Sequence, residues 1–204
     1  MGEVAELAFR EPDRLRARLV RILGRTAGNH AANVRRLAVR LAQRLEIPDS
    51  SVAAIALGSV LHDAGKLCVP QAILAKPAPL TEAEWRIVRR HPVAGEQLLE
   101  PFVQSQEVLS IIRFHHERRD GLGYPDGRAQ AEIPLAARVV GTADAYEAMT
   151  EPRAYRLPRS TDQALRELTA HSGSQFDPDC ARALGELIRD DADELASNTR
   201  VAGE

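Results

Sequence analysis

The sequence has 204 residues, of which 44% are hydrophobic and only 4% aromatic, and a formal net charge of -2. This length suits one domain with a substantial core, and the nearly balanced charge excludes a general attraction to nucleic-acid polymers or to membranes. The first residues lack the basic start and the apolar run of a signal peptide, and no stretch is long enough to span a membrane, so we expect a cytoplasmic protein.

The spacing of apolar residues predicts helices along the whole chain and no strand. The helices are expected over about residues 15–22, 34–45, 50–66, 81–100, 105–117 and 133–150, with two more that begin near residues 160 and 178. The loop over residues 118–133 is long and rich in Gly and Pro, which is more typical of a functional segment than of a simple connector. The helix over residues 50–66 is apolar on nearly every face until His62 and is therefore expected in the core.

Capping signals mark several of these boundaries. Thr81 with Glu84, and Ser160 with Gln163, have the spacing of capping boxes. Pro92 is expected to kink or split the helix over residues 81–100.

Other boundary signals are simpler. Asp49 or Ser50 can cap the helix over residues 50–66, and Asp177 with Pro178 can start the last helix. Cys68 and Cys180 lie far apart without a CxxC spacing, so we interpret both as packing residues rather than as a disulfide or a zinc site.

The fold class is therefore expected to be all-α, as a single-domain helical bundle. Residues 1–25 are expected to form an N-terminal helix, residues 26–190 the core, and residues 191–204 a flexible tail.

Five of the six histidines fall on the predicted helices or at their ends. These five are His30, His62, His91, His115 and His116. A pair of adjacent histidines can also be a polar helix end that runs into a turn, but ordered spacing over five segments is improbable by chance. Histidine and carboxylate without cysteine suit Fe, Mn or Zn in a hydrolytic site.

Asp63 directly follows His62 and can bridge two cations about 3.5 to 4 Å apart with its two oxygens. Such a pair of cations lowers the pKa of bound water and neutralises charge on a phosphoryl group, so we expect hydrolysis of a phosphate ester. Lys66 would present a cation to a phosphate oxygen or to a leaving group, although it could also only complement the end of its helix.

From about Gly28 to Pro178 the sequence resembles the HD-GYP family, a branch of the HD phosphohydrolase superfamily that cleaves cyclic di-GMP in bacteria. The motifs that carry this resemblance are HDAGK, PQAILAKPAPLTEAEW, RRHPVAGEQLL, HHERRDGLGYP, IPLAARVVGTADAYEAMTEPRAYR and GSQFDP.

The resemblance implies a helical bundle of the HD phosphohydrolase type around two divalent metal ions, with Fe or Mn favoured. It places seven residues in ligand positions: His30, His62, Asp63, His91, His115, His116 and Asp144. Asp63 would be the bridging ligand and Lys66 would assist at the phosphate. Tyr124, Arg153 and Arg156 would hold the phosphates or the guanines of the substrate, because arginine forks form paired hydrogen bonds.

The sequence also departs from the family pattern. Thr26 stands where many members carry a glutamate that helps hold a third metal, so we expect two metals rather than three. Asn33, Glu147 and Ala154 replace a usual Arg, Asp and Pro, with an open effect on substrate fit. Because only about 25 residues precede the match, the chain is either free-standing or the catalytic part of something longer.

The resemblance implies a phosphodiesterase that opens cyclic di-GMP to linear pGpG, with slower cleavage on to GMP. Two alternatives remain at this level. The substrate could be another cyclic dinucleotide such as 3',3'-cyclic GMP-AMP, or the chain could be a catalytically weak sensor that signals to a protein partner through the GYP loop.

Overall fold

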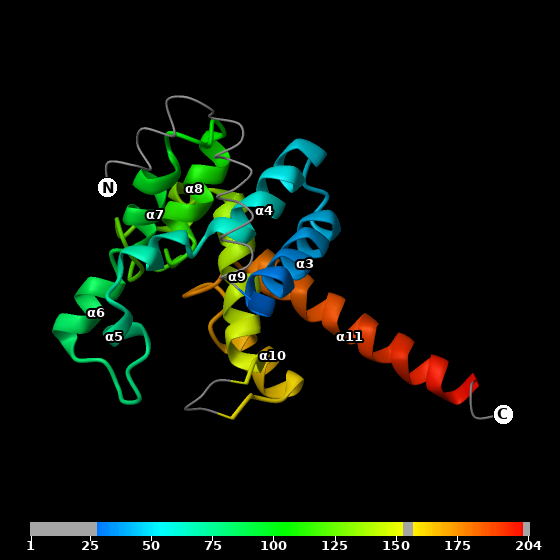
Figure 1. The fold of residues 1–204 in the computed structure, drawn as a ribbon. Helices are drawn as coiled ribbons and strands as arrows, with labels where there is room; N and C mark the ends of the chain where they lie inside the picture. Colours follow the sequence, from blue (N-terminus) through cyan, green and yellow to red (C-terminus); the bar gives the residue numbers. More distant parts are fainter. Residues whose placement is uncertain (1–27, 153–156, 202–204) are drawn as a thin grey trace.

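The computed structural model describes residues 28–152 and 157–201, and of residues 195–201 only the backbone. Within these ranges the regular elements are helices and no strand is formed, which confirms the expected all-α class (Figure 1). The elements are α3 (Gly28–Arg44), α4 (Asp49–Leu61), η1 (Ala64–Cys68), α5 (Gln71–Leu74), α6 (Glu82–Val88), α7 (His91–Leu99), α8 (Gln106–Phe114), η2 (Gln130–Glu132), α9 (Leu135–Thr150), α10 (Thr161–Ala170) and α11 (Pro178–Val201). The helix expected over residues 1–25 lies outside the described residues.

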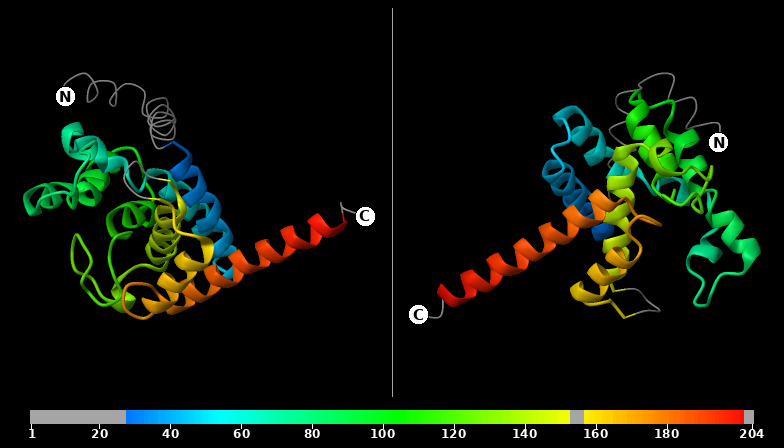
Figure 2. Two further views of the ribbon diagram at one scale, coloured as in Figure 1. Left: turned by 90° about the horizontal axis from the view of Figure 1, so that it is seen from below. Right: turned by 180° about the vertical axis from the view of Figure 1, so that it is seen from behind.

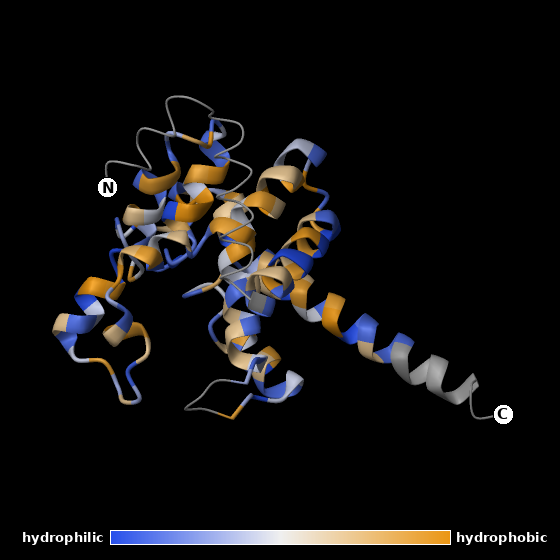
Figure 3. Ribbon diagram, viewed as in Figure 1, coloured by the Kyte–Doolittle hydropathy of each residue, from blue (hydrophilic) through white to orange (hydrophobic). Residues whose placement is uncertain are grey.

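Helix α9 is the centre of the fold and packs against α3, α4, α8, α10 and α11. Its small apolar side chains, among them Val139, Val140 and Ala143, are buried and allow neighbouring helices to approach closely. Leu37 and Leu41, one turn apart on α3, are buried in the same core. The hydropathy colouring shows apolar segments of α3, α4 and α9 gathered where these helices meet (Figure 3).

A second apolar cluster joins α4 and η1 to α7 and α8, and it includes Leu61, Leu99, Val108 and Ile112. The short helices α5 and α6 project away from this part, and α11 extends away from the bundle in every view (Figure 2). No helix among the described residues combines the length and the hydropathy needed to cross a membrane.

The middle of α11 is tied to α3 by ion pairs between Arg40 and Asp191 and between Arg44 and Asp190. The helix then continues through Val201, into the range expected to form a flexible tail. The flexibility of that range stays a prediction.

The capping signals predicted several boundaries correctly. Both capping boxes form, since Thr81 accepts from the Glu84 amide and Ser160 accepts from the Gln163 amide. The helix expected over residues 81–100 is split, with α6 ending at Val88 and α7 beginning at His91. The last helix begins at Pro178, and the Asp177 carboxylate accepts from two amides of its first turn.

Three expectations were wrong. Pro48, rather than Asp49 or Ser50, is the N-cap of α4, because its extended backbone leads directly into the helix. The helix expected over residues 50–66 ends at Leu61, and HDAGK leads into the separate turn η1. Cys180 is buried as expected, but Cys68 is exposed because η1 buries only Ala64 and Gly65 of its residues.

Candidate metal centre

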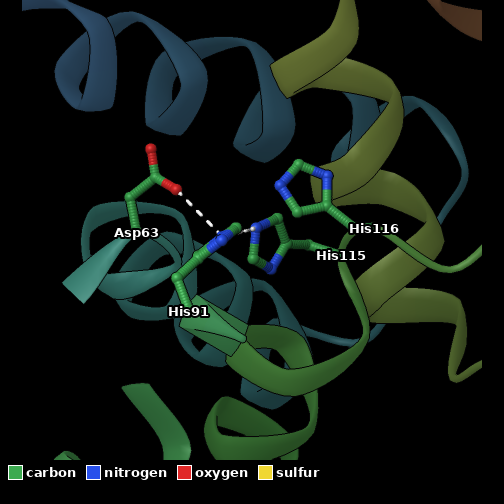
Figure 4. A group of neighbouring side chains, drawn as sticks. All are labelled: Asp63, His91, His115 and His116. Atoms are coloured by element: carbon green, nitrogen blue, oxygen red, sulfur yellow. Dashed lines mark hydrogen bonds and ion pairs between the residues drawn. The ribbon is translucent and has the colours of Figure 1, made fainter. Parts of the chain in front are cut away.

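The seven residues expected as metal ligands lie in two adjacent groups. One group contains Asp63, His91, His115 and His116, which Figure 4 shows converging, and the other contains His30, His62 and Asp144. In each group the ligand atoms lie within 4.8 Å of one another. Rings of the two groups are in contact, since the centroids of His62 and His115 are 5.0 Å apart. The structure thus brings together residues from helices that are distant in the sequence.

Most of these residues lie at helix ends. His62 and His115 are the C-terminal caps of α4 and α8, and His91 is the first residue of α7. Asp144 alone lies well inside a helix, in the central α9, and His30 lies in the first turn of α3. The ends of several helices therefore meet around one side of α9.

Three of the histidines are oriented by the same hydrogen bond to the backbone. The Nδ1 atoms of His62, His91 and His115 lie 2.7, 2.8 and 2.9 Å from the carbonyl oxygens three residues earlier. A carbonyl oxygen only accepts, so each Nδ1 carries a proton and donates it. In the neutral ring this leaves Nε2 as a bare acceptor, which is the form that binds a metal.

The Nε2 atoms of His91 and His115 lie close to each other and to the Asp63 carboxylate. Nε2 of His91 lies 3.4 Å from Nε2 of His115 and 3.3 Å from Oδ1 of Asp63. Nε2 of His62 and Oδ1 of Asp63 are both buried without a hydrogen-bond partner. Buried polar atoms without a partner are costly, and cations placed among these nitrogen and oxygen atoms would remove that cost. The residues present therefore fit a pair of divalent metal ions.

His30 lies between two carboxylates. Its Nε2 is 3.0 Å from Oδ1 of Asp144, and its Nδ1 is 3.1 Å from Oε2 of Glu151, although the second contact lacks the geometry of a hydrogen bond. Glu151 was not among the expected site residues. It directly follows α9, and only the packing of α9 against α3 places its carboxylate beside His30.

The ionisation of the two aspartates follows from the rings around them. Burial raises the pKa of a carboxyl, but His62 at Asp63 and His30 at Asp144 outweigh burial and hold both pKa values well below the usual range. Both groups are thus carboxylates at neutral pH and supply the negative charge that a cation requires.

The histidines divide into two kinds. Burial disfavours the charged ring at His62, but the Asp63 and Asp144 carboxylates raise its pKa to about 9, so without a metal this ring is protonated at pH 7 and a cation would replace the proton on Nε2. For His115 and His116, burial lowers the pKa, in the case of His116 to about 4. These two rings are therefore neutral at pH 7 and already in the state that binds metal.

Two glycines allow the histidines their positions. A Cβ atom at Gly65 would lie 1.8 Å from the carbonyl oxygen of His91, and one at Gly141 would lie 2.5 Å from that of His115. Both neighbours are backbone atoms, which a rotamer change cannot move. Because these two glycines lack a side chain, η1 can pack directly against α7, and α9 can pack directly against the end of α8.

Lys66 and Tyr124 lie at the edge of the cluster. The Lys66 ammonium is 2.6 Å from Oδ2 of Asp63, and the Tyr124 ring stacks on His116 with centroids 4.8 Å apart. Burial raises the pKa of the Tyr124 hydroxyl, so this group is a neutral donor at pH 7. Arg153 and Arg156 lie outside the described residues.

Two cavities open on the cluster. One has a volume of about 470 Å³, and its walls include His115, His116, Asp144, Tyr124 and Arg89. The other has a volume of about 620 Å³, and its walls include His30, His62, Asp63 and Lys66. Arg89 was not expected here, because the pair of arginines before His91 gives no sign of which one faces the site.

Two of the departures from the family pattern contact each other. The side chain of Asn33 on α3 is hydrogen-bonded to the carboxyl of Glu147 on α9. Burial raises the pKa of Glu147, and the nearby Arg36, His30 and Asn33 side chains oppose that rise only in part. The two replacements therefore lie against each other near His30, while Thr26 and Ala154 lie outside the described residues.

The loop over residues 118–133 is anchored by Glu117, a buried residue that the sequence did not single out. Its Oε1 atom accepts hydrogen bonds from the amides of Asp126 and Gly127, at 2.7 and 3.0 Å. Sequence reasoning had no signal for this role beyond the position of Glu117 directly after the paired histidines. The carboxylate therefore holds the far side of the loop close to His116.

We expect Glu117→Ala to loosen this loop, because two backbone amides lose their acceptor at a cost of about 1 to 3 kcal/mol each. Amide exchange over residues 118–133 should accelerate about tenfold or more, while α3 and α9 keep their protection. Glu100→Ala, which removes an exposed carboxylate at the end of α7, is the control and should leave exchange in the loop unchanged. Equal exchange in the two variants would contradict the anchoring role.

The sequence matches the family described as HD domain over residues 6–180. It is 41% identical over 160 residues to the cyclic di-GMP phosphodiesterase PA4108 of Pseudomonas aeruginosa, covering 78% of this chain and 38% of that protein. It is 38% identical over 191 residues to the cyclic di-GMP phosphodiesterase response regulator RpfG of Xanthomonas campestris, covering 90% and 49%. The chain thus spans half or less of the length of these relatives.

Two further similarities concern substrate and fold. The chain is 37% identical over 163 residues to a 3'3'-cGAMP-specific phosphodiesterase of Vibrio cholerae, covering 80% of this chain and 35% of that one. Among solved structures, an HD-GYP protein of Bdellovibrio bacteriovorus, Bd1817, superposes with a TM-score of 0.65 at 23% identity, covering 78% of this chain and 51% of that one. The similarity to Bd1817 concerns the arrangement of the helices in space.

Proposed function

Since this chain belongs to the HD domain family, in its HD-GYP branch, we propose that it is a metal-dependent phosphodiesterase that hydrolyses cyclic di-GMP to linear pGpG, with slower cleavage on to GMP. The observation that carries the proposal is the convergence of unpaired Nε2 and carboxylate oxygen atoms in a buried cluster that two cavities reach. Such a cluster is suited to hydrolysis and has no evident structural use without cations.

Two divalent ions, with Fe or Mn favoured, would be held by the seven converging residues: His30, His62, Asp63, His91, His115, His116 and Asp144. When bound, the two ions supply a nucleophilic water at neutral pH and neutralise charge that develops on the phosphoryl group. Asp63 is the proposed shared ligand because it lies against rings of both groups, with His91 on one oxygen and His62 on the other.

The remaining proposed roles concern binding of the substrate. The Lys66 ammonium lies beside Asp63 and half in solvent, so it can reach a phosphate oxygen at the cluster without moving far. The Tyr124 hydroxyl can donate to a phosphate or a guanine from the opposite side. Arg153 and Arg156 are proposed to bind phosphates or guanines through paired hydrogen bonds.

A second substrate, 3',3'-cyclic GMP-AMP, is favoured by one specific observation, the similarity to a relative that is named for it. Guanine and adenine differ in a few hydrogen-bonding groups, so discrimination depends on individual contacts in the cavities. Competition between the two cyclic dinucleotides for the same enzyme separates these substrates.

The sensor alternative would use the surface of the GYP loop. Leu122 in this loop is 78% exposed and lies on the wall of the cavity that contains Tyr124. In that alternative, a protein partner would read the occupied state of the cavity by contacting this leucine.

The deciding experiment starts with anaerobic purification and elemental analysis. We expect about two metal ions per chain and, with Mn(II) or Fe(II), conversion of cyclic di-GMP to pGpG, followed by chromatography. Faster turnover of cyclic GMP-AMP would favour the second substrate. Binding of cyclic di-GMP without product would favour the sensor, and neither binding nor turnover would overturn the proposal.

A further inference from the structure

The arginine that ends helix α6 occupies an unusual position beside the cluster. The Arg89 guanidinium carbon lies 5.7 Å from the centre of the Trp85 ring and 5.8 Å from that of the Tyr124 ring. Trp85 lies one turn earlier on α6, whereas Tyr124 comes from the GYP loop and stacks on His116. Two rings therefore orient the guanidinium at the wall of the 470 Å³ cavity.

Arg89 also differs from the other arginines on the wall of this cavity, because it forms no ion pair within the described part of the chain. The other arginines on the cavity wall are paired, Arg118 with Asp120 and both Arg119 and Arg138 with Asp177. Within the described part of the chain, Arg89 has no carboxylate partner, only the two rings. Its hydrogen-bond donors are therefore available to an anion that enters the cavity.

Each of the two cavities combines proposed metal ligands with a cationic side chain, which in the case of Lys66 is paired with Asp63. Lys66 lies on the wall of the cavity that exposes His30, His62 and Asp63, and Arg89 lies on the wall of the cavity that exposes His116 and Asp144. A ligand that spans the cluster thus meets an ammonium on one side and a guanidinium on the other. This arrangement suits a molecule with two separate anionic groups.

We propose that Arg89 binds the second phosphodiester of the cyclic dinucleotide, the one that is not being cleaved. This inference rests on the proposed function, because it requires a substrate with two phosphodiesters. While one phosphodiester lies at the cluster beside Lys66, the other remains charged and requires its own partner. A guanidinium fork suits this task because it contacts two phosphate oxygens at once, and the rings of Trp85 and Tyr124 hold it in place.

The test compares two substrates in the metal-loaded full chain. Cyclic di-GMP carries two phosphodiesters, whereas bis(p-nitrophenyl) phosphate carries one. For Arg89→Ala we expect kcat/KM on cyclic di-GMP to fall about 10- to 100-fold, mainly through a higher KM, as for loss of a charged hydrogen bond. The loss on bis(p-nitrophenyl) phosphate should be much smaller, and metal content should match the wild type.

Two further variants define the origin of the effect. Arg90→Ala removes the neighbouring exposed arginine, which lies on neither cavity wall, and should retain wild-type KM on both substrates. Arg89→Lys keeps the charge but not the fork, and should recover only part of the lost affinity.

Four results would overturn the inference. An equal loss on both substrates would mean that Arg89 supports the loop or the cluster rather than a second phosphate. A wild-type KM for cyclic di-GMP in Arg89→Ala would mean that the cation is not used. If the wild-type chain binds cyclic di-GMP without turnover, calorimetric titration replaces kinetics, and an unchanged Kd in Arg89→Ala contradicts the inference. A wild-type chain that cleaves only bis(p-nitrophenyl) phosphate and does not bind cyclic di-GMP would remove the proposed substrate and the inference with it.

Discussion

Replacement of Asp63 by alanine is expected to abolish turnover and to remove most of the bound metal. The carboxylate faces His62 and His91 with different oxygens and is the proposed ligand common to both ions. Loss of residues that merely orient a ligand typically costs 10- to 100-fold in metal affinity or activity, so loss of a shared ligand should exceed about 100-fold. Elemental analysis and the rate of pGpG formation measure the two effects.

The Asp63 prediction has two matched variants. Asp63→Asn keeps the size of the side chain but supplies only one neutral oxygen, and should lose nearly as much metal as alanine. Asp162→Ala removes an exposed carboxylate in the first turn of α10 and should retain metal and rate. Full metal content and rate in Asp63→Ala would show that Asp63 is not a shared ligand.

The second large effect is expected from Gly65→Ala. The added methyl group would meet the His91 carbonyl oxygen at 1.8 Å and the Gly95 amide nitrogen at 2.5 Å, so η1 must move away from α7. We expect a loss of about 3 kcal/mol in the free energy of unfolding, at the upper end of the usual cost of overpacking. Since the movement separates Asp63 from His91, metal content should fall as well. Urea denaturation and elemental analysis measure these two changes.

A glycine elsewhere in the chain provides the control. At Gly185 in α11, an added Cβ atom would meet only the flexible Arg189 side chain, at 3.7 Å. Gly185→Ala should therefore increase the free energy of unfolding by up to about 1 kcal/mol through helix propensity, with no change in metal content. If Gly65→Ala were as stable and as fully metallated as the wild type, the close approach of η1 and α7 would not matter for the site.

The parts of the fold that could be predicted depend on local interactions. Each capping box joins residues three positions apart, so Thr81 with Glu84 and Ser160 with Gln163 could be read directly from the sequence. The exposure of Cys68 could not, because it depends on how a short turn sits on α7. The expected continuous helix over residues 50–66 failed for the same reason, since the chain turns after His62 to bring Asp63 toward His91.

For the candidate site, the residue types were predictable but the supporting contacts were not. Histidines next to carboxylates in ordered motifs indicated the convergence that the structure shows for the described ligand positions. Glu117, Glu151 and Arg89 carry no such pattern, because their roles depend on loops and helices that meet only after folding. The proposed assignments of Arg153 and Arg156 stay predictions.

The distance along the chain between His30 and Asp144 links metal binding to the folding of the protein. These two residues are 114 positions apart, and their side chains meet only where α3 docks on α9. A nascent or unfolded polypeptide holds its imidazoles and carboxylates too far apart to chelate an ion with all of them. The full set of proposed ligands for an ion therefore exists only once α3 has docked on α9, so metal binding and folding of the bundle are expected to stabilise each other.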